Sequence, residues 1–179
     1  IARVATRTAP FLQPDTLPDM PLIPPSREDD LDAITRIYGH HVLHGTGTFE
    51  TTPPSAADMA VRRADVLGKG LPWLVIEEGG QVLGFAYGNW FKPRPAYRFS
   101  VEDSIYLAPQ TAGKGLGRAL LAELLAQLER GGVRKVMAVI GDSANAGSIG
   151  VHRTLGFEHT GVLRAAGWKF GRWLDVVLM

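Results

Sequence analysis

The feature that most constrains this chain is a glycine-rich turn between an extended segment and a leucine-rich one. Residues 110–118 read QTAGKGLGR, with glycines at the alternate positions 113, 115 and 117. Residues 99–107 before the turn predict a strand. After it, leucines recur at helical spacing: Leu116, Leu120, Leu121, Leu124, Leu125 and Leu128. A strand, a turn and an amphipathic helix in this order predict an α/β protein, with helices packed on a sheet.

The same turn predicts a site for an anion. Glycine tolerates positive φ, so the backbone can turn its N–H groups inward, and the first N–H groups of the helix have no intrahelical partner. Lys114 and Arg118 add positive charge. A G-x-x-x-x-G-K-[ST] phosphate loop fails because Gly115 follows Lys114, and a G-x-G-x-x-G fingerprint fails because its third glycine comes one residue early. A helix start that binds nothing stays the alternative.

The rest of the chain predicts one domain from residue 22 to residue 179. Helical patterns cover residues 26–42, 55–67 and, more weakly, 142–154. Extended runs at 73–78 and 81–89 flank Gly79 and Gly80, which is typical of a hairpin. Residues 135–140 predict a central strand and residues 158–179 two more. Residues 1–21, with prolines at 10, 14, 18 and 21, predict an extended arm.

Composition excludes several classes of protein. Nineteen basic residues against eighteen acidic ones argue against a dedicated partner for nucleic acid or anionic membranes. No apolar run approaches the roughly 18–20 residues of a membrane span. The chain has no cysteine, which excludes disulfides and thiolate metal sites and is consistent with the cytoplasm.

Two motifs carry a resemblance to a known superfamily. Gln110-x-x-Gly113-x-Gly115 resembles the Q/R-x-x-G-x-G/A signature of the GNAT acetyltransferases. Asn145-x-x-Ser148, followed by Leu155-Gly156-Phe157, resembles their second cofactor motif. Strings at residues 48–51, 97–98, 101–106, 139–142 and 169–175 resemble the phosphinothricin and methionine sulfoximine acetyltransferase branch. The resemblance covers residues 22–179.

This resemblance implies a GNAT fold: a mixed, mostly antiparallel central sheet with splayed strands, flanked by helices. It also implies an N-acetyltransferase that uses acetyl-CoA, holds no metal and forms a homodimer. The cofactor arm would pair with the strand at Ile105, Tyr106 and Leu107. The pyrophosphate would lie on Gly113, Lys114, Gly115, Leu116, Gly117 and Arg118. Asn145 would hydrogen-bond the arm, although local chemistry alone equally predicts a helix cap.

The resemblance also indicates how the reaction proceeds. An amine must lose a proton before it attacks a thioester, and Glu102 is the candidate base, directly or through a water. Strand alternation puts Glu102 and Asp103 on opposite faces, and burial would raise the pKa of Glu102. A surface carboxylate is the alternative. His152 stands where many relatives have a tyrosine acid; it is either an acid or a packed polar residue, and a thiolate can leave without one.

In similar enzymes Phe49, Glu50, Lys92, Arg94 and Tyr97 fall in segments that line the acceptor pocket. Arg94 would clamp a carboxylate, which suits phosphinothricin, methionine sulfoximine or methionine sulfone; a solvated loop arginine is the alternative. Two other functions stay open: acetylation of protein N-termini or another macromolecule, and acyl-CoA sensing without catalysis.

Two further clusters bear on partners. His40, His41 and His44 invite a metal interpretation, which the absence of an HExxH pattern or a suitably spaced carboxylate disfavours. Trp168, Phe170 and Trp173 near the C-terminus predict packing on the core or on a second subunit.

Overall fold

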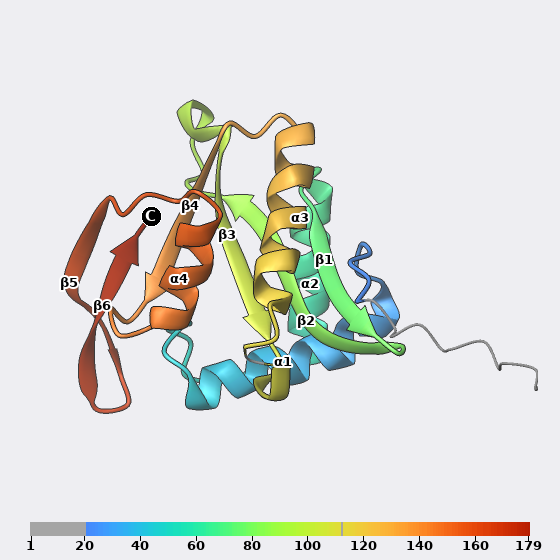
Figure 1. The fold of residues 1–179 in the computed structure, drawn as a ribbon, viewed down its shortest axis with the longest axis horizontal. Coiled ribbons are helices and arrows are strands. Elements are labelled where there is room, and N and C mark those ends of the chain that lie inside the picture. The colour runs from blue at the N-terminus through green and yellow to red at the C-terminus, as the bar shows by residue number, and fades with distance from the viewer. Residues whose placement is uncertain (1–20, 112) are drawn as a thin grey trace, which may run out of the picture.

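A six-stranded sheet with helices on both faces forms the body of the protein (Figure 1). The computed structural model describes residues 21–111 and 113–179. The sheet has the order β1-β2-β3-β4-β6-β5, and every pair is antiparallel except β3 with β4. The strands are β1 (Trp73–Glu78), β2 (Gln81–Trp90), β3 (Ser100–Leu107), β4 (Lys135–Gly141), β5 (Gly161–Lys169) and β6 (Arg172–Leu178). The helices are α1 (Leu31–His44), α2 (Ala56–Gly68), α3 (Leu116–Arg130) and α4 (Ala146–Thr154), with short 3-10 turns at Glu28–Asp30, Pro95–Tyr97 and Pro109–Thr111.

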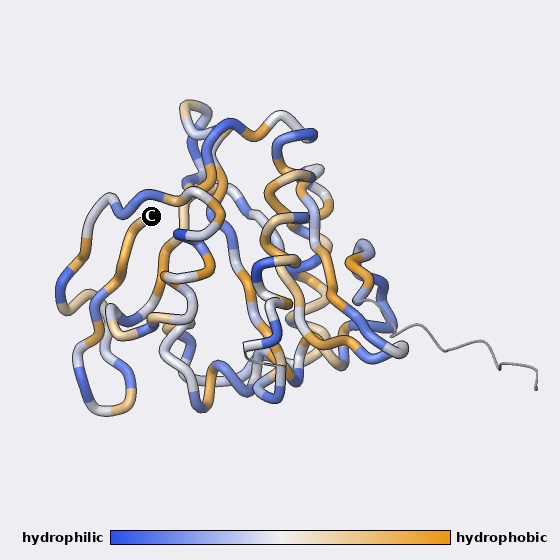
Figure 2. The backbone as a smooth tube through the Cα atoms, viewed as in Figure 1, coloured by the Kyte–Doolittle hydropathy of each residue, from blue (hydrophilic) through white to orange (hydrophobic). Residues whose placement is uncertain are grey.

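The helices bury apolar faces against opposite sides of the sheet. α1 and α2 pack on one side, around Trp73, Val75 and Phe85. α3 packs on the other side with five buried leucines, Leu116, Leu120, Leu121, Leu124 and Leu128. Figure 2 shows the hydrophobic colour concentrated along the central strands and α3. No helix within residues 21–111 and 113–179 is long and apolar enough to cross a membrane.

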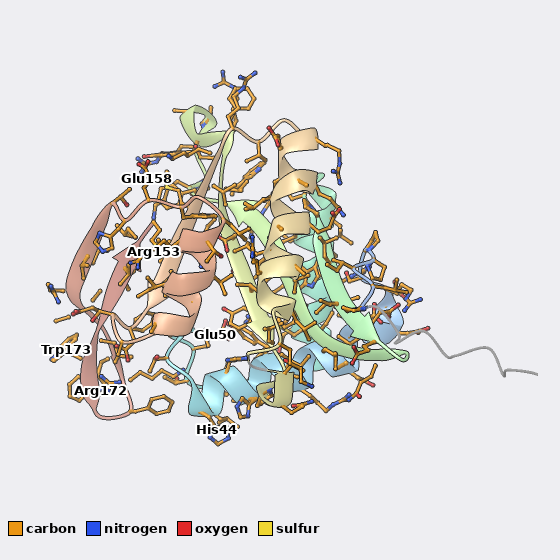
Figure 3. All side chains as sticks on the ribbon, viewed as in Figure 1. His44, Glu50, Arg153, Glu158, Arg172 and Trp173 are labelled. Carbon is orange, nitrogen blue, oxygen red and sulfur yellow. The ribbon has the colours of Figure 1, made fainter. Side chains whose placement is uncertain are left out.

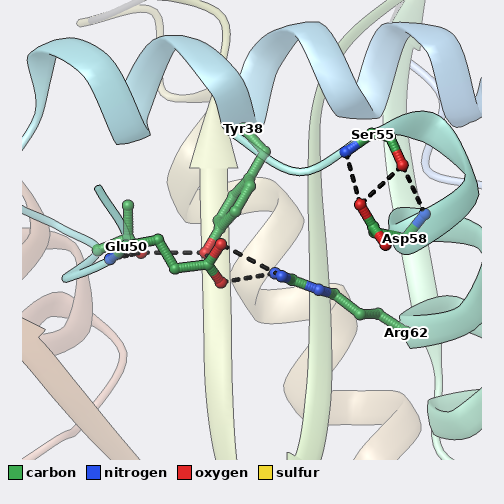
Figure 4. Close-up of polar contacts among 6 residues, drawn as sticks. Tyr38, Glu50, Ser55, Asp58 and Arg62 are labelled. Atoms are coloured by element: carbon green, nitrogen blue, oxygen red, sulfur yellow. Dashed lines mark hydrogen bonds and ion pairs between the residues drawn. The ribbon is translucent and has the colours of Figure 1, made fainter. Parts of the chain in front are cut away.

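Local signals in the sequence account for the ends of several elements. Gly79 and Gly80 join β1 to β2 with φ of 56° and 74°, a conformation that glycine adopts without strain. Ser55 caps α2: its Oγ accepts from the Asp58 N–H at 3.1 Å, and the Asp58 carboxylate accepts from the Ser55 N–H at 2.9 Å (Figure 4). The expected hairpin and the expected second helix are both confirmed.

β3 and β4 pair only over half of their length. The parallel ladder runs from Ser100 opposite Lys135 to Asp103 opposite Ala138. Beyond that point β4 continues to pair with β6, while within the described residues the rest of β3 pairs with β2 alone. The predicted GNAT fold with splayed strands is therefore confirmed.

The described chain is tied to the sheet from its first residues. The Leu22 N–H donates to the Glu77 carbonyl at 2.8 Å, and the Glu77 N–H donates back at 2.9 Å. Apart from Pro21, the expected arm over residues 1–21 lies outside the described residues, so it stays a prediction.

Candidate active site

A cavity of about 870 Å³ lies where β3 and β4 diverge. Its walls come from the end of α1 and the following loop, from β3, β4 and α4, and from the start of β6. His44 on α1 and Arg172 on β6 both line it, and Figure 3 shows these residues on separate elements. The predicted site residues that line the cavity are Phe49, Glu102, Ile105, Tyr106, Leu107, Gly113, Gly117, Asn145 and His152.

The free edge of β3 presents backbone polar groups to this cavity. The Ala108 N–H donates to Leu83 on β2 at 2.8 Å. Because the polar groups alternate along a strand, those of Leu107 and Ile105 point away from β2, while those of Tyr106 point toward it. His41 on α1 donates through Nε2 to the Leu107 carbonyl at 2.8 Å. Ile105 and the Leu107 N–H are therefore the groups best placed to pair with an extended ligand.

The glycine-rich turn starts α3 in the manner that the sequence predicts. Gly113 and Gly115 have φ of 79° and 77°, in the left-handed region, and Gly115 caps the helix. Gly117 packs against β3, where an added Cβ would come within 3.2 Å of the Leu107 side chain. Leu116 is buried in the core, so only its backbone can serve a ligand, whereas Lys114 and Arg118 are exposed cations beside the turn.

Asn145 performs the capping role that local chemistry predicts. Its Oδ1 accepts from the Ser148 N–H at 3.2 Å, which caps α4. The same side chain lines the cavity. Capping therefore fixes the orientation of Asn145, and its role toward a cofactor stays a prediction.

Glu102 places a half-buried carboxylate in the cavity. It lies on β3, opposite Asn89 of β2 and Met137 of β4. Burial raises the pKa of Glu102, the charge of Asp103 raises it further, and Lys92 opposes the shift. Among the described residues, none hydrogen-bonds the Glu102 carboxylate, so it is free to accept a proton from a ligand.

Asp103 faces the other side of β3, as alternation predicts, and meets His152 of α4. The distance from His152 Nε2 to Asp103 Oδ2 is 2.9 Å, and both side chains are almost fully buried. Burial by itself lowers the pKa of His152, but the hydrogen bond to Asp103, its charge and the Ser148 carbonyl outweigh burial, so the pKa is raised. The sequence predicted the face of Asp103 but not its partner.

A loop after α1 closes one side of the cavity with Phe49. The Phe49 ring packs where a Cβ on Gly167 of β5 would have to lie, so that position accepts no side chain. The buried Lys169 holds the loop: its ammonium donates to the Gly45 carbonyl at 2.8 Å and to the Thr48 carbonyl at 2.7 Å. Sequence reasoning missed Lys169, because its partners lie more than a hundred residues away in the chain.

Glu50 turns away from the cavity. Its carboxylate accepts from the Tyr38 hydroxyl at 2.9 Å and from Arg62 at 2.6 and 3.2 Å (Figure 4). It therefore ties α1 to α2. The segment in which the sequence placed Glu50 does reach the cavity, through Phe49.

The other predicted acceptor residues lie apart from the cavity. Lys92, Arg94 and Tyr97 line a separate hollow of about 180 Å³ in the segment between β2 and β3. The charge of Lys92 still reaches Glu102. Of the five residues in the predicted acceptor segments, the structure thus brings only Phe49 into the cavity with Glu102. The substrate roles of Lys92, Arg94 and Tyr97 stay predictions.

The three histidines of α1 lie in different surroundings. His40 and His44 are neighbours, with ring centroids 4.9 Å apart, whereas His41 turns to the Leu107 carbonyl. Within residues 21–111 and 113–179, no three His, Asp or Glu side chains are grouped as metal ligands would be.

The residues around the cavity fit acetyl-CoA. The turn at Gly113 and Gly115 leaves open space where other residues would carry a Cβ, as close approach of a pyrophosphate requires. The free edge of β3 can pair with an amide-containing arm. The cavity between these features is of the size that small-molecule sites occupy.

Comparison with known proteins identifies the class. Residues 40–157 match the acetyltransferase (GNAT) family, and the chain belongs to this family. Within it, the chain is 52% identical over 153 residues to phosphinothricin N-acetyltransferase of Alcaligenes faecalis, covering 86% of this chain and 78% of that protein. It is 42% identical over 152 residues to the L-methionine sulfoximine/L-methionine sulfone acetyltransferase of Salmonella typhimurium, covering 84% and 87%.

A solved structure agrees with these relatives. The phosphinothricin acetyltransferase of Sinorhizobium meliloti, crystallised in complex with acetyl-CoA, superposes with a TM-score of 0.86 at 48% identity, covering 89% of this chain and 86% of that one. The predicted family and branch, and the prediction of an acetyltransferase, are confirmed.

Proposed function

We propose that this enzyme transfers the acetyl group of acetyl-CoA to the primary amine of a small amino-acid-like substrate of the phosphinothricin, methionine sulfoximine or methionine sulfone type. One observation carries the proposal: the Glu102 carboxylate lies, half-buried and without a hydrogen bond among the described residues, in a cavity that a glycine-rich helix start also lines. The names of the relatives support the substrate class.

Acetyl-CoA, when bound, supplies an acyl group activated as a thioester. The backbone of residues 113–118 would hold its pyrophosphate, with Lys114 and Arg118 adding charge. Ile105 and the Leu107 N–H would hydrogen-bond its arm. Asn145, fixed by its cap, would contribute from the opposite wall.

Glu102 would act as the general base. A primary amine is largely protonated at neutral pH, so its proton must be removed before it can attack. A base works best when its pKa approaches the working pH, and burial moves Glu102 in that direction. The carboxylate would take the proton directly or through a water, while Phe49 and Tyr87 line the cavity around it.

The amine panel is the direct test of the substrate class. Purified enzyme is incubated with acetyl-CoA and an excess of phosphinothricin, methionine sulfoximine, methionine sulfone or a ribosomal-protein N-terminal peptide, and free thiol is followed. We expect thiol release with the small amines. Release with the peptide alone would instead favour acetylation of a macromolecule, and release with none of them would favour an acyl-CoA sensor.

The exposed aromatic side chains of β5 and β6 support a further part of the proposal. Trp168, Phe170 and Trp173 are each more than half exposed, which is the kind of patch a second copy would cover. We therefore keep the homodimer as part of the proposed function. The cytoplasmic location stays a prediction from the sequence.

A further inference from the structure

Two titratable side chains, Asp103 and His152, are buried on the face of β3 opposite to that of Glu102. Asp103 is 6% exposed and His152 is 2% exposed. The distance from His152 Nε2 to Asp103 Oδ2 is 2.9 Å, and this contact joins α4 to β3. The Phe157 ring covers His152 edge-on at 4.9 Å. Two groups of this kind are costly to bury unless their charges compensate each other.

The hydrogen bonds of His152 account for both ring nitrogens. Nδ1 lies 2.7 Å from the Ser148 carbonyl oxygen, which only accepts, so Nδ1 must carry a proton. Nε2 lies 2.9 Å from the Asp103 carboxylate, which accepts when it is ionised. An imidazolium satisfies both acceptors at once. In that state both N–H groups are directed at protein acceptors, and neither is directed at a ligand in the cavity.

The buried negative charge of Asp103 depends on His152 for its compensation. The Asp103 Oδ1 atom is buried without a hydrogen-bond donor among the described residues. Among the same residues, His152 is the cationic side chain that pairs with the Asp103 carboxylate, through Oδ2. Asp103 is also the neighbour of Glu102 on the same strand, where its negative charge opposes the ionisation of Glu102. The protonated imidazole therefore has an effect beyond joining two elements, since it cancels the charge that acts most directly on the candidate base.

We infer that His152 is a positioning residue that serves as the buried counter-ion of Asp103, and that this neutralisation keeps Glu102 able to ionise and act as the base. The inference rests on the proposed function for the role of Glu102. It replaces the expectation that His152 is the acid that protonates the leaving thiolate, because both of its N–H groups are already engaged.

The other titratable groups around the cavity are compatible with this effect of His152 on the ionisation of Glu102. Lys92 and Tyr87 face Glu102 from the segment after β2 and from β2 itself. Burial lowers the pKa of His41 and raises the pKa values of Tyr38, Tyr87 and Tyr106, so these groups are neutral near neutral pH. The remaining titratable lining residues are His44 and the ion pair of Asp142 with Arg172.

The state of the pair can be observed in the wild-type protein. In enzyme labelled with ¹⁵N-histidine, the His152 ring is assigned by through-bond correlation and its protonation is followed with pH. We expect both ring nitrogens to be protonated at neutral pH, with an imidazolium that persists above the pH of about 6.5 at which an unperturbed imidazole loses its proton. An unprotonated Nε2 at neutral pH would overturn the inference, and no variant has to fold for this result.

Kinetics then separate a counter-ion from an acid or a simple structural tie. In His152→Gln the amide can still donate to Asp103 but carries no charge, so Asp103 is left uncompensated. We expect the acid limb of kcat/KM for the amine to move up by about half to one pH unit, a loss of about threefold to tenfold below the limb. The double variant Asp103→Asn/His152→Gln carries neither charge, and its limb should return to the wild-type position or below it. His159→Gln is the matched control.

Each other outcome has a definite meaning. A limb that stays in place in both variants contradicts the inference. A lower kcat in His152→Gln at every pH, not restored in the double variant, would make His152 an acid. If Glu102→Gln keeps full turnover, the proposed base is wrong, yet the NMR result still decides whether the buried pair exists as an imidazolium and a carboxylate.

Discussion

At the scale of single residues, Glu102 and Asp103 are neighbours in the chain that have different surroundings. A strand turns consecutive side chains to opposite faces. Both residues line the cavity, but the Asp103 carboxylate is buried against α4 and paired with His152. Glu102 keeps no protein partner among the described residues, whereas Asp103 is paired with a histidine. Only the first is free to exchange a proton with a substrate.

The raised pKa of Glu102 predicts a characteristic pH dependence. A base works when it is deprotonated, so kcat/KM for the amine should fall as the pH drops through the pKa of Glu102. Because burial raises that pKa, the acid limb should lie above the value of about 4.3 of an exposed glutamate. The profile is measured at saturating acetyl-CoA with two amines of different basicity.

The choice of two amines supplies the control. Ionisation of the amine itself gives a limb that moves when the amine is changed, whereas the limb of Glu102 stays in place. A single limb that follows the amine would show that no enzyme group of raised pKa governs the reaction.

At the scale of elements, the start of α3 is the part of the site that the sequence predicts best. Glycine spacing, the preceding strand and the leucine stripe are all local, and local signals determine caps and turns. The structure places Gly113 and Gly115 in the left-handed conformation that this spacing requires.

Gly115→Ala tests this turn. Nothing lies within 4 Å of the added Cβ, so the cost comes from the φ of 77° and should be about 1–2 kcal/mol of unfolding free energy. The KM for acetyl-CoA should rise while the KM for the amine changes little, as measured by steady-state kinetics beside denaturant unfolding. Gly150→Ala in α4 also enters open space, but without a positive φ, and should be neutral or slightly stabilising. Equal effects at the two positions would contradict this account.

The loop after α1 is an element whose position the sequence could not predict. It is held by Lys169, whose carbonyl partners at Gly45 and Thr48 are distant in the chain. For the same reason, local patterns did not indicate that residues 92–97 would form a hollow of their own. Both depend on how β2, β3 and β5 are brought together.

Lys169→Met should release this loop. The buried Thr48 carbonyl and the part-buried Gly45 carbonyl would lose their donor, at a cost of about 1–3 kcal/mol each, and Phe49 would lose its fixed place in the cavity wall. We expect a lower free energy of unfolding in denaturant. Relative to the wild type, the KM for the amine should rise more than the KM for acetyl-CoA. Lys135→Met, at an exposed lysine, is the control. An unchanged KM for the amine would show that the loop does not shape the acceptor site.

At the scale of the whole molecule, the cavity is a consequence of sheet topology. β3 pairs with β4 only as far as Asp103 and Ala138, and the rest of β4 pairs with β6. The two central strands therefore separate around the site. The sequence predicted the order of helices and strands, because hydrophobic periodicity is local. The insertion of β6 between β4 and β5, and the contact of Asp103 with His152, are long-range pairings that periodicity does not specify.

The central claim is that this cavity carries out acetyl transfer with Glu102 as its base, and Glu102→Gln tests it most directly. The substitution keeps the size of the side chain and removes its basicity. At saturating amine and acetyl-CoA, near neutral pH, kcat should fall by about 10²–10⁴-fold with little change in the KM for acetyl-CoA, while Glu129→Gln on the exposed face of α3 should match the wild type. A folded Glu102→Gln enzyme that turns over at the wild-type rate would contradict the account.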